Sequence, residues 1–143
     1  MSIIRSSDSD YTDRIQGMRL LVNNRYTEDD LPQVTLENDV YLGAANRRVA
    51  FLVPNFSSLS ASDQEDVKVV VQHEVAISVL KSELEALRES TEQMSEDRRG
   101  IEISERISMY ESKNKLTISR VNPSSSVSGS DGGTQLITTT PTW

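Results

Sequence analysis

The sequence predicts an all-α fold, a small bundle of about four helices with one long central helix and an extended C-terminal tail. Apolar residues recur at three- and four-residue spacing in several separate segments, which is the pattern of amphipathic helices. Residues 63–94 contain neither Gly nor Pro, the two residues that most disfavour a helix interior. The composition then changes to Ser, Gly and Thr near residue 122. We therefore expect a helical domain at 1–121 and a flexible tail at 122–143.

The central helix is expected from Asp63 to Met94. Two sets of residues at seven-residue spacing would give it one packing face, interrupted once by a histidine. We call this set the heptad face; it comprises Val70, His73, Ile77, Leu80, Leu84 and Leu87.

A second apolar ridge lies away from the heptad face of this helix. Val71, Val75 and Val79 follow one another at four-residue spacing, so the N-terminal half of the helix is expected to be buried on two sides. Charged residues dominate after Lys81, so the C-terminal half is expected to project or to line a surface. We expect the ridge to serve packing or assembly.

A first helix is expected from about Tyr11, with Asp8 or Ser9 as its cap. Its apolar stripe would comprise Tyr11, Ile15, Met18 and Leu21 or Val22. An acidic loop follows, and we expect it to be ordered because Leu31 anchors it and Pro32 fixes its backbone.

A second helix is expected from Thr35 to Phe51, with Tyr41 at the edge of its buried face. A fourth helix is expected after Gly100. Residues 116–121 alternate apolar and polar side chains and could instead form a strand. The residues expected to be buried are Leu36, Val40, Ala44, Val49 and Leu52 in the second helix, and Ile103, Ile107 and Tyr110 in the fourth.

The tail has two interpretations. Its composition is typical of a disordered chain end. Its residues 135–140, QLITTT, also have high β propensity and follow a Ser- and Gly-rich stretch, so they could add a strand to a partner's sheet. The partner-binding residues would then be Leu136, Ile137, Thr138 and Thr139, with Trp143 as an anchor.

The sequence offers little for catalysis, and we do not expect an enzyme. It has no cysteine, one histidine and no phosphate-binding or metal-binding motif, so no catalytic, cofactor or metal residue is expected. His73 lies on an apolar helix face and is interpreted as a satisfied core group. The carboxylates Glu28, Asp29 and Asp30 are interpreted as a solvated turn rather than a cation site.

Charge and hydropathy exclude two kinds of partner. The net charge is −7 and the 15 Lys and Arg residues are scattered, so sequence-specific binding of nucleic acid is not expected. No apolar run reaches the length of a membrane span, and the start of the chain has no apolar signal core. We expect a soluble, unsecreted protein without a membrane partner.

The stretch between the first and the long helix resembles the head-to-tail adaptor proteins of tailed phages. In that family a pattern DDxLPxxxIxxxxYLxxAE recurs, and Asn46 stands here where the family usually has an acidic residue. The order of helices over residues 10–110 is also similar. The residues that carry the resemblance are Asp29, Asp30, Leu31, Pro32, Leu36, Tyr41, Leu42, Ala44 and Ala45, the two aspartates standing directly before Leu31.

The resemblance implies a structural protein of the virion neck. Such adaptors form a ring, typically twelvefold, beneath the portal protein at the capsid vertex, and their C-terminal segment reaches into the portal. The implied partners are the portal, copies of the chain itself and tail or tail-terminator proteins, while DNA passes through without sequence-specific binding. Assembly would take place in the host cytoplasm. The alternative is a helical regulatory or scaffold protein that dimerises through the heptad face.

Overall fold

The computed structural model describes residues 2–90 and 96–123, and every regular element within them is helical. The predicted all-α fold with one long helix is therefore confirmed for these residues, while most of the expected tail lies outside them. The elements are α1 (Tyr11–Val22), α2 (Gln33–Leu36), the π-helical η1 (Asp39–Gly43), α3 (Ala44–Leu52), the 3-10 helix η2 (Phe56–Ser58), α4 (Ala61–Ser90), the π-helical η3 (Glu96–Gly100) and α6 (Ile101–Val121).

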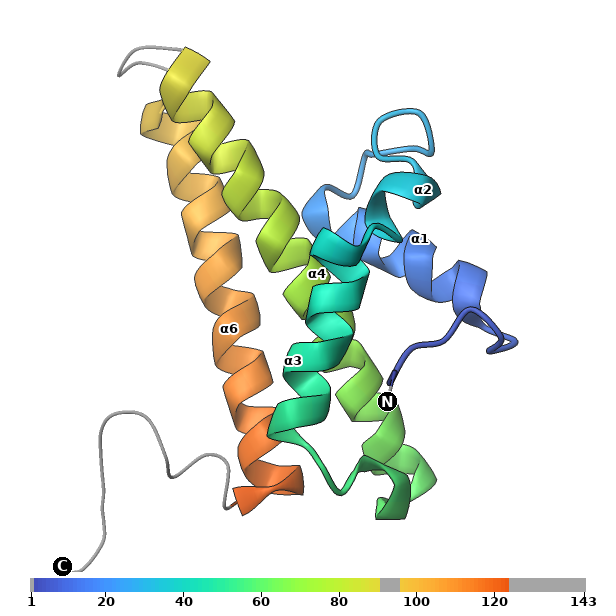
Figure 1. Cartoon of the computed structure of the whole chain (residues 1–143). Helices are drawn as coiled ribbons and strands as arrows, with labels where there is room; N and C mark the ends of the chain where they lie inside the picture. Colours follow the sequence, from blue (N-terminus) through green and yellow to red (C-terminus); the bar gives the residue numbers. More distant parts are fainter. Residues whose placement is uncertain (1, 91–95, 124–143) are drawn as a thin grey trace, which may run out of the picture.

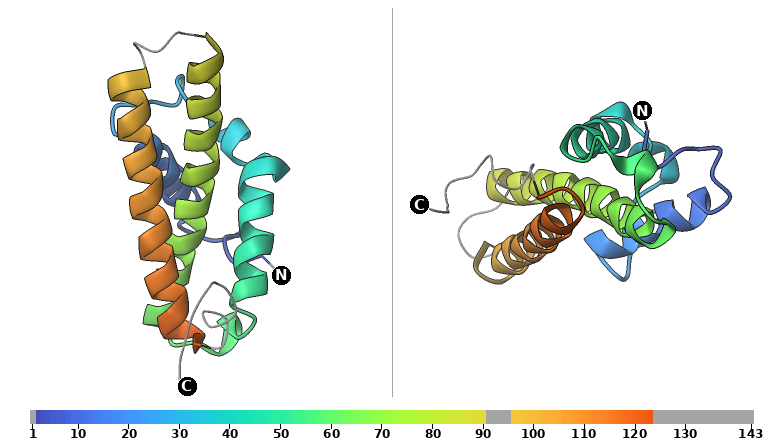
Figure 2. Two further views of the ribbon diagram at one scale, coloured as in Figure 1. Left: turned by 90° about the vertical axis from the view of Figure 1, so that its left-hand side faces the viewer. Right: turned by 90° about the horizontal axis from the view of Figure 1, so that it is seen from below.

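The long helix α4 lies at the centre, and the other helices surround it (Figure 1). α6 runs antiparallel along one side of α4, and the view from below places α3 on the opposite side of α4 from α6 (Figure 2). α1 packs on a third side. The upper ends of α4 and α6 extend beyond the other helices, which agrees with the charged C-terminal half expected for the long helix (Figure 1).

Hydrogen bonds from α4 identify its three contact faces. His73 reaches α6, Gln72 reaches α1, and Ser82 lies beside Tyr41 of η1. With about 100° between successive helical residues, these contacts point in three different directions around the helix. The part of the helix between them is thus surrounded by protein.

The valine ridge lies in the part of α4 that is enclosed by α1 and α3. Val71 and Val75 are fully buried, and Val79 is 5% exposed. On a helical wheel these positions fall between the direction of Gln72, which contacts α1, and that of Ser82, which lies beside η1. The ridge therefore packs within one chain.

The boundaries of α4 and α6 can be compared with the sequence-based expectation. α4 begins at Ala61, two residues before the expected start, and Ser60 Oγ accepts from the Asp63 amide at 3.2 Å as an N-cap. Residues 91–94 of the expected helix lie outside the described residues. α6 continues as a helix to Val121, so a strand at 116–121 is wrong. The helix continues because Asn114, Ile118 and Val121 extend the buried stripe of α6 at helical spacing.

The expected second helix is interrupted at Asn38. The Asn38 backbone is extended, with φ −56° and ψ 145°, and its side chain accepts a hydrogen bond from the Val40 amide at 2.9 Å. The π-helical turn that follows shifts the register of the helix. Leu42 and Ala45 therefore face the core, and the expected burial of Val40 is wrong, since its side chain is 69% exposed.

The first helix forms as expected, but its cap does not. Asp10 precedes the helix without a side-chain cap, and the Asp8 carboxylate accepts instead from the Arg5 amide at 3.0 Å. Gly17 allows α1 and α4 to approach closely, because a Cβ there would lie 2.6 Å from Gln72 Nε2. That Nε2 donates to the Arg14 carbonyl at 2.9 Å, so the glycine makes room for a buried interhelical hydrogen bond.

Candidate functional site

The acidic loop before α2 is held by one buried arginine. Arg19 is 3% exposed, and its Nε donates to the Leu31 carbonyl at 2.7 Å while its Nη2 donates to Glu28 at 2.7 Å. Leu31 itself is 7% exposed. Asp30 accepts from the Thr27 amide at 2.9 Å, which closes the turn. Leu31 is buried, which is what an anchor of the loop requires, and Arg19 is the partner that sequence reasoning missed.

The acidic side chains of this loop are engaged in turn geometry rather than gathered around a cation. Nowhere in residues 2–90 and 96–123 do three or more His, Cys, Asp or Glu side chains form a group that could hold a metal ion. This part of the chain gives no support to a metal centre.

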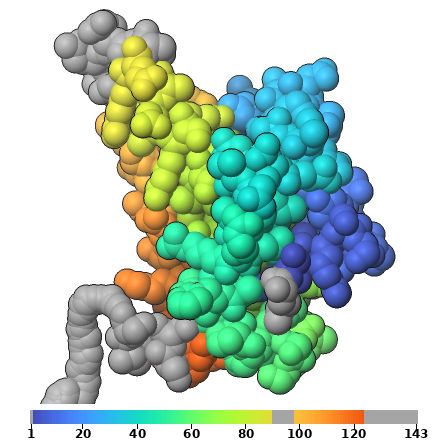
Figure 3. Space-filling view, viewed as in Figure 1, coloured from blue at the N-terminus to red at the C-terminus, as the bar shows by residue number. Residues whose placement is uncertain are grey.

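The segment from Gln33 to Leu52, which we call the α2–α3 arm, packs one face on α4. It runs along the molecule between α1 and the α4–α6 pair (Figure 3). Tyr41, at the edge of this face, places its hydroxyl 3.4 Å from Ser82 Oγ. The buried residues of the arm are Leu36, Leu42, Ala45, Asn46 and Val49.

Asn46 fastens the start of the chain to the α2–α3 arm. Its Oδ1 accepts from the amides of Ile3 at 3.0 Å and Ile4 at 2.9 Å, and its Nδ2 donates to the Ile4 carbonyl at 3.0 Å. Ile3 and Ile4 are 1% and 2% exposed, so they belong to the core. A carboxylate could accept these amides but could not donate to the carbonyl.

His73 is a buried, hydrogen-bonded group between α4 and α6. Asn114 Nδ2 donates to Glu74 Oε2 at 3.0 Å, so its Oδ1 is the acceptor for His73 Nδ1 at 2.8 Å. The Tyr110 ring stacks on the imidazole with centroids 4.9 Å apart. Burial lowers the pKa of His73, and the positive charge of Lys113 lowers it further against the opposing effects of Asn114 and Glu74. A buried imidazole that is hydrogen-bonded through Nδ1 and stacked on Tyr110 fits a packing role.

The outer face of the arm is apolar and open to solvent. Val40 is 69% and Phe51 is 83% exposed. Val40, Ala44, Arg47 and Phe51 follow one another at three- or four-residue spacing, and we call this set the outer stripe. Its direction is opposite to that of the buried residues of α3.

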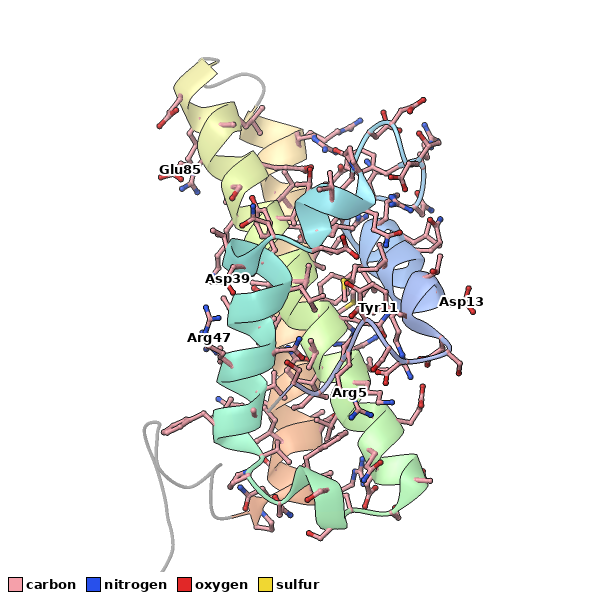
Figure 4. All side chains as sticks on the ribbon, turned by 45° about the vertical axis from the view of Figure 1, so that its right-hand side comes forward. Arg5, Tyr11, Asp13, Asp39, Arg47 and Glu85 are labelled. Atoms are coloured by element: carbon pink, nitrogen blue, oxygen red, sulfur yellow. The ribbon has the colours of Figure 1, made fainter. Side chains whose placement is uncertain are left out.

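Arg47 is held within this stripe by a neighbouring carboxylate. Its Nη1 donates to Asp39 Oδ1 at 2.9 Å, and both side chains project from the arm away from the bundle (Figure 4). The hydrogen bond from Arg47, more than the charge alone, lowers the pKa of Asp39. The stripe thus combines apolar side chains with an oriented guanidinium.

Two further arginines pair with carboxylates of α4. Arg48 pairs with Glu74 at 3.5 Å and Arg99 with Glu83 at 3.5 Å, so these arginines have partners within the chain. The predicted partner-binding residues of the tail, Leu136, Ile137, Thr138, Thr139 and Trp143, lie outside the described residues.

Comparison with protein-family models, with curated proteins and with solved structures finds no match to this chain. Among the helices of residues 2–90 and 96–123, none combines the length and the apolar content that a membrane crossing requires.

Proposed function

We propose that this chain is an adaptor of the head-to-tail connector of a tailed phage. It forms a ring beneath the portal at the capsid vertex, joins head to tail and continues the DNA conduit. Its partners are the portal protein, copies of itself, expected in a twelvefold ring, and tail or tail-terminator proteins. It acts in the neck of the virion after assembly in the host cytoplasm.

The observation that carries the proposal is the division of the α2–α3 arm into two faces. Leu36, Leu42 and Ala45, which carry the resemblance to the adaptor pattern, are the residues that pack the arm on α4. The opposite face exposes Val40 and Phe51, whose apolar side chains the fold does not use. A protein that works by assembly needs such a rigidly mounted apolar face, either to bind a neighbouring chain or to hold its own C-terminal segment.

Charge is consistent with a DNA conduit. The net charge of −7 disfavours adhesion of DNA to the protein, which suits a channel through which DNA must pass.

The burial of the heptad face argues against the alternative, a regulatory or scaffold protein that dimerises through this face. Most of the heptad face packs within the chain, since Val70, Ile77 and Leu80 are 1%, 5% and 1% exposed. His73 of the same face contacts Asn114 of α6. A dimer through this face would have to displace α6.

The test is binding to the cognate portal protein. We expect the full chain to co-sediment with the portal and to increase in mass to a ring, while a chain ending at Val121 keeps its melting temperature but loses binding. A stable dimer without portal affinity would refute the adaptor. A truncated chain that binds as tightly as the full chain would refute a role for the tail and leave the helical surface to bind the portal.

A further inference from the structure

We propose that the outer stripe (Val40, Ala44, Arg47 and Phe51) is the docking site for the C-terminal segment of this same chain, residues 136–143. The proposal goes beyond the adaptor function and does not depend on it, because it concerns a single chain without a portal. The stripe is an exposed apolar helix face, and its occupant is inferred from the place where the described chain ends.

The chain leaves the bundle beside the end of α3. Asn122 Nδ2 donates to the Leu52 carbonyl at 2.9 Å, and Asn55 Nδ2 donates to the Val121 carbonyl at 3.3 Å. These two hydrogen bonds hold the C-terminal end of α6 against the last residue of α3 and the segment that follows it. The chain therefore leaves α6 at the C-terminal end of α3, the helix that carries Phe51, the most exposed of the large apolar side chains described.

A buried acceptor at this exit has no donor among the described residues. Asn55 Oδ1 is buried and has no hydrogen-bond partner there. Buried polar atoms normally have a partner, so a donor from the residues after Pro123 would complete this amide. Such a contact would hold the start of the tail beside α3 rather than along the outer face of α6.

The connecting segment has the reach that docking requires. Residues 124–135 are rich in Ser and Gly, and a flexible linker of this length has an end-to-end distance of roughly 20 Å. The stripe from Phe51 to Val40 is roughly 16 Å long at helical rise. The segment would experience an effective concentration on the order of 1 mM at the stripe, so an intrinsic Kd of about 0.1 mM would leave it about 90% docked.

The chemistry of the two surfaces is complementary. Leu136, Ile137 and Trp143 offer apolar area, and residues 132–143 carry no charged side chain that would need to be desolvated. The stripe offers Val40 and Phe51 for apolar contact. Arg47, oriented by Asp39, offers a guanidinium that can stack on an indole ring.

The outer face of α6 is the competing site, and it is less suitable. Ile101, Met109 and Leu116 are 56%, 45% and 72% exposed, but Glu105 and Lys113 lie between them in the sequence on the same side of the helix. A segment docked there would have to pass two charged side chains. Leu116 therefore provides the matched control, since its exposure of 72% lies between those of Val40 and Phe51 and it is carried by the last turns of α6, near the exit.

Trp143 is the only tryptophan of the chain, so its emission reports docking directly. The full chain should show blue-shifted emission with restricted quenching by acrylamide, unchanged on dilution. Phe51→Asp should shift the emission to the red and raise the quenching constant, whereas Leu116→Asp should leave both unchanged. Circular dichroism checks that both variants keep the helix content of the parent.

Three results would overturn the proposal. Fully solvated Trp143 emission in the parent would show that the segment does not dock. A red shift caused by Leu116→Asp and not by Phe51→Asp would move the site to α6. Emission that becomes solvated on dilution would show that the segment binds a second copy. Each of these outcomes is independent of portal binding, so it leaves the adaptor proposal to its own test.

Discussion

Replacing Asn46 by alanine should release the N-terminal segment Ser2–Arg5 rather than unfold the protein. The substitution removes two acceptor contacts to the amides of Ile3 and Ile4 and one donor contact to the Ile4 carbonyl. If the segment stayed in place, three buried backbone groups would lack partners at a cost of about 1 to 3 kcal/mol each. Detachment avoids that cost because water then satisfies these groups.

The size of the effect is limited by the net free energy of docking this segment. Burial of Ile3 and Ile4 contributes about 1.5 to 3 kcal/mol each, and three hydrogen bonds contribute about 1 kcal/mol each. Ordering about four residues costs about 1 to 2 kcal/mol per residue. The net stabilisation by the docked segment is therefore about 2 kcal/mol, and Asn46→Ala should destabilise by about that amount.

A double-mutant cycle with a chain lacking residues 2–4 measures this coupling. In the shortened chain, Asn46→Ala should change the free energy of unfolding by less than about 0.5 kcal/mol, because its partners are gone. Amide exchange at Ile3 and Ile4 should rise to solvent rates in the single variant. The exposed Arg47→Ala on the same helix is the control and should have little effect. Equal destabilisation by Asn46→Ala in both chains would refute the coupling.

Three further predictions follow from the packing. Val75→Asp places a carboxylate in a fully buried position and should lower the free energy of unfolding by about 3 to 5 kcal/mol. The exposed Glu85→Ala is the control and should change it little. Equal melting temperatures of the two variants would contradict burial of the ridge. Leu31→Ser should loosen the acidic loop and reduce amide protection in α2 and η1 more than Asp29→Ser does, and equal protection would exclude Leu31 as the anchor. His73 has a lowered pKa in the folded state, so its contribution to stability is present above pH 6.5, its ordinary pKa, and is lost as pH falls from there through the folded pKa. His73→Gln should remove that part of the pH dependence of unfolding, and an unchanged profile would argue against it.

The sequence predicts the central helix well because its signals are local and repeated. A helix of 30 residues without Gly or Pro forms from propensity and from an apolar pattern that continues over many turns. The burial of Val71, Val75 and Val79 follows from the same spacing, since only a helix surrounded by protein can bury a second ridge. Leu31 is likewise predictable, as an apolar residue next to a proline within an acidic loop.

The features that the sequence does not predict depend on single side-chain contacts across the fold. α2 ends before Asn38, whose side-chain oxygen accepts from the Val40 amide and caps the next turn. The π-helical turn that follows places Leu42 rather than Val40 on the buried face. Ile3 and Ile4 join the core through Asn46, more than forty residues away along the chain. A short apolar pair at a chain start carries no periodic signal, so its burial depends on a partner that pattern analysis cannot identify.

The shift of helical register at η1 buries Leu42 and exposes Val40. At a buried position the fold itself explains why the side chain is apolar, so an apolar side chain there gives no information about a partner. Val40 and Phe51 have no such reason, because they are 69% and 83% exposed and contribute little to the core. In a chain ending at Val121, which has no C-terminal segment to dock, replacing both by serine should leave the free energy of unfolding within about 0.5 kcal/mol of the parent. In the full chain the same replacement should cost no more than the docking itself, about 1.4 kcal/mol for a segment that is about 90% docked. Loss of Trp143 protection or of portal binding in the full-chain variant would therefore report recognition rather than damage to the core.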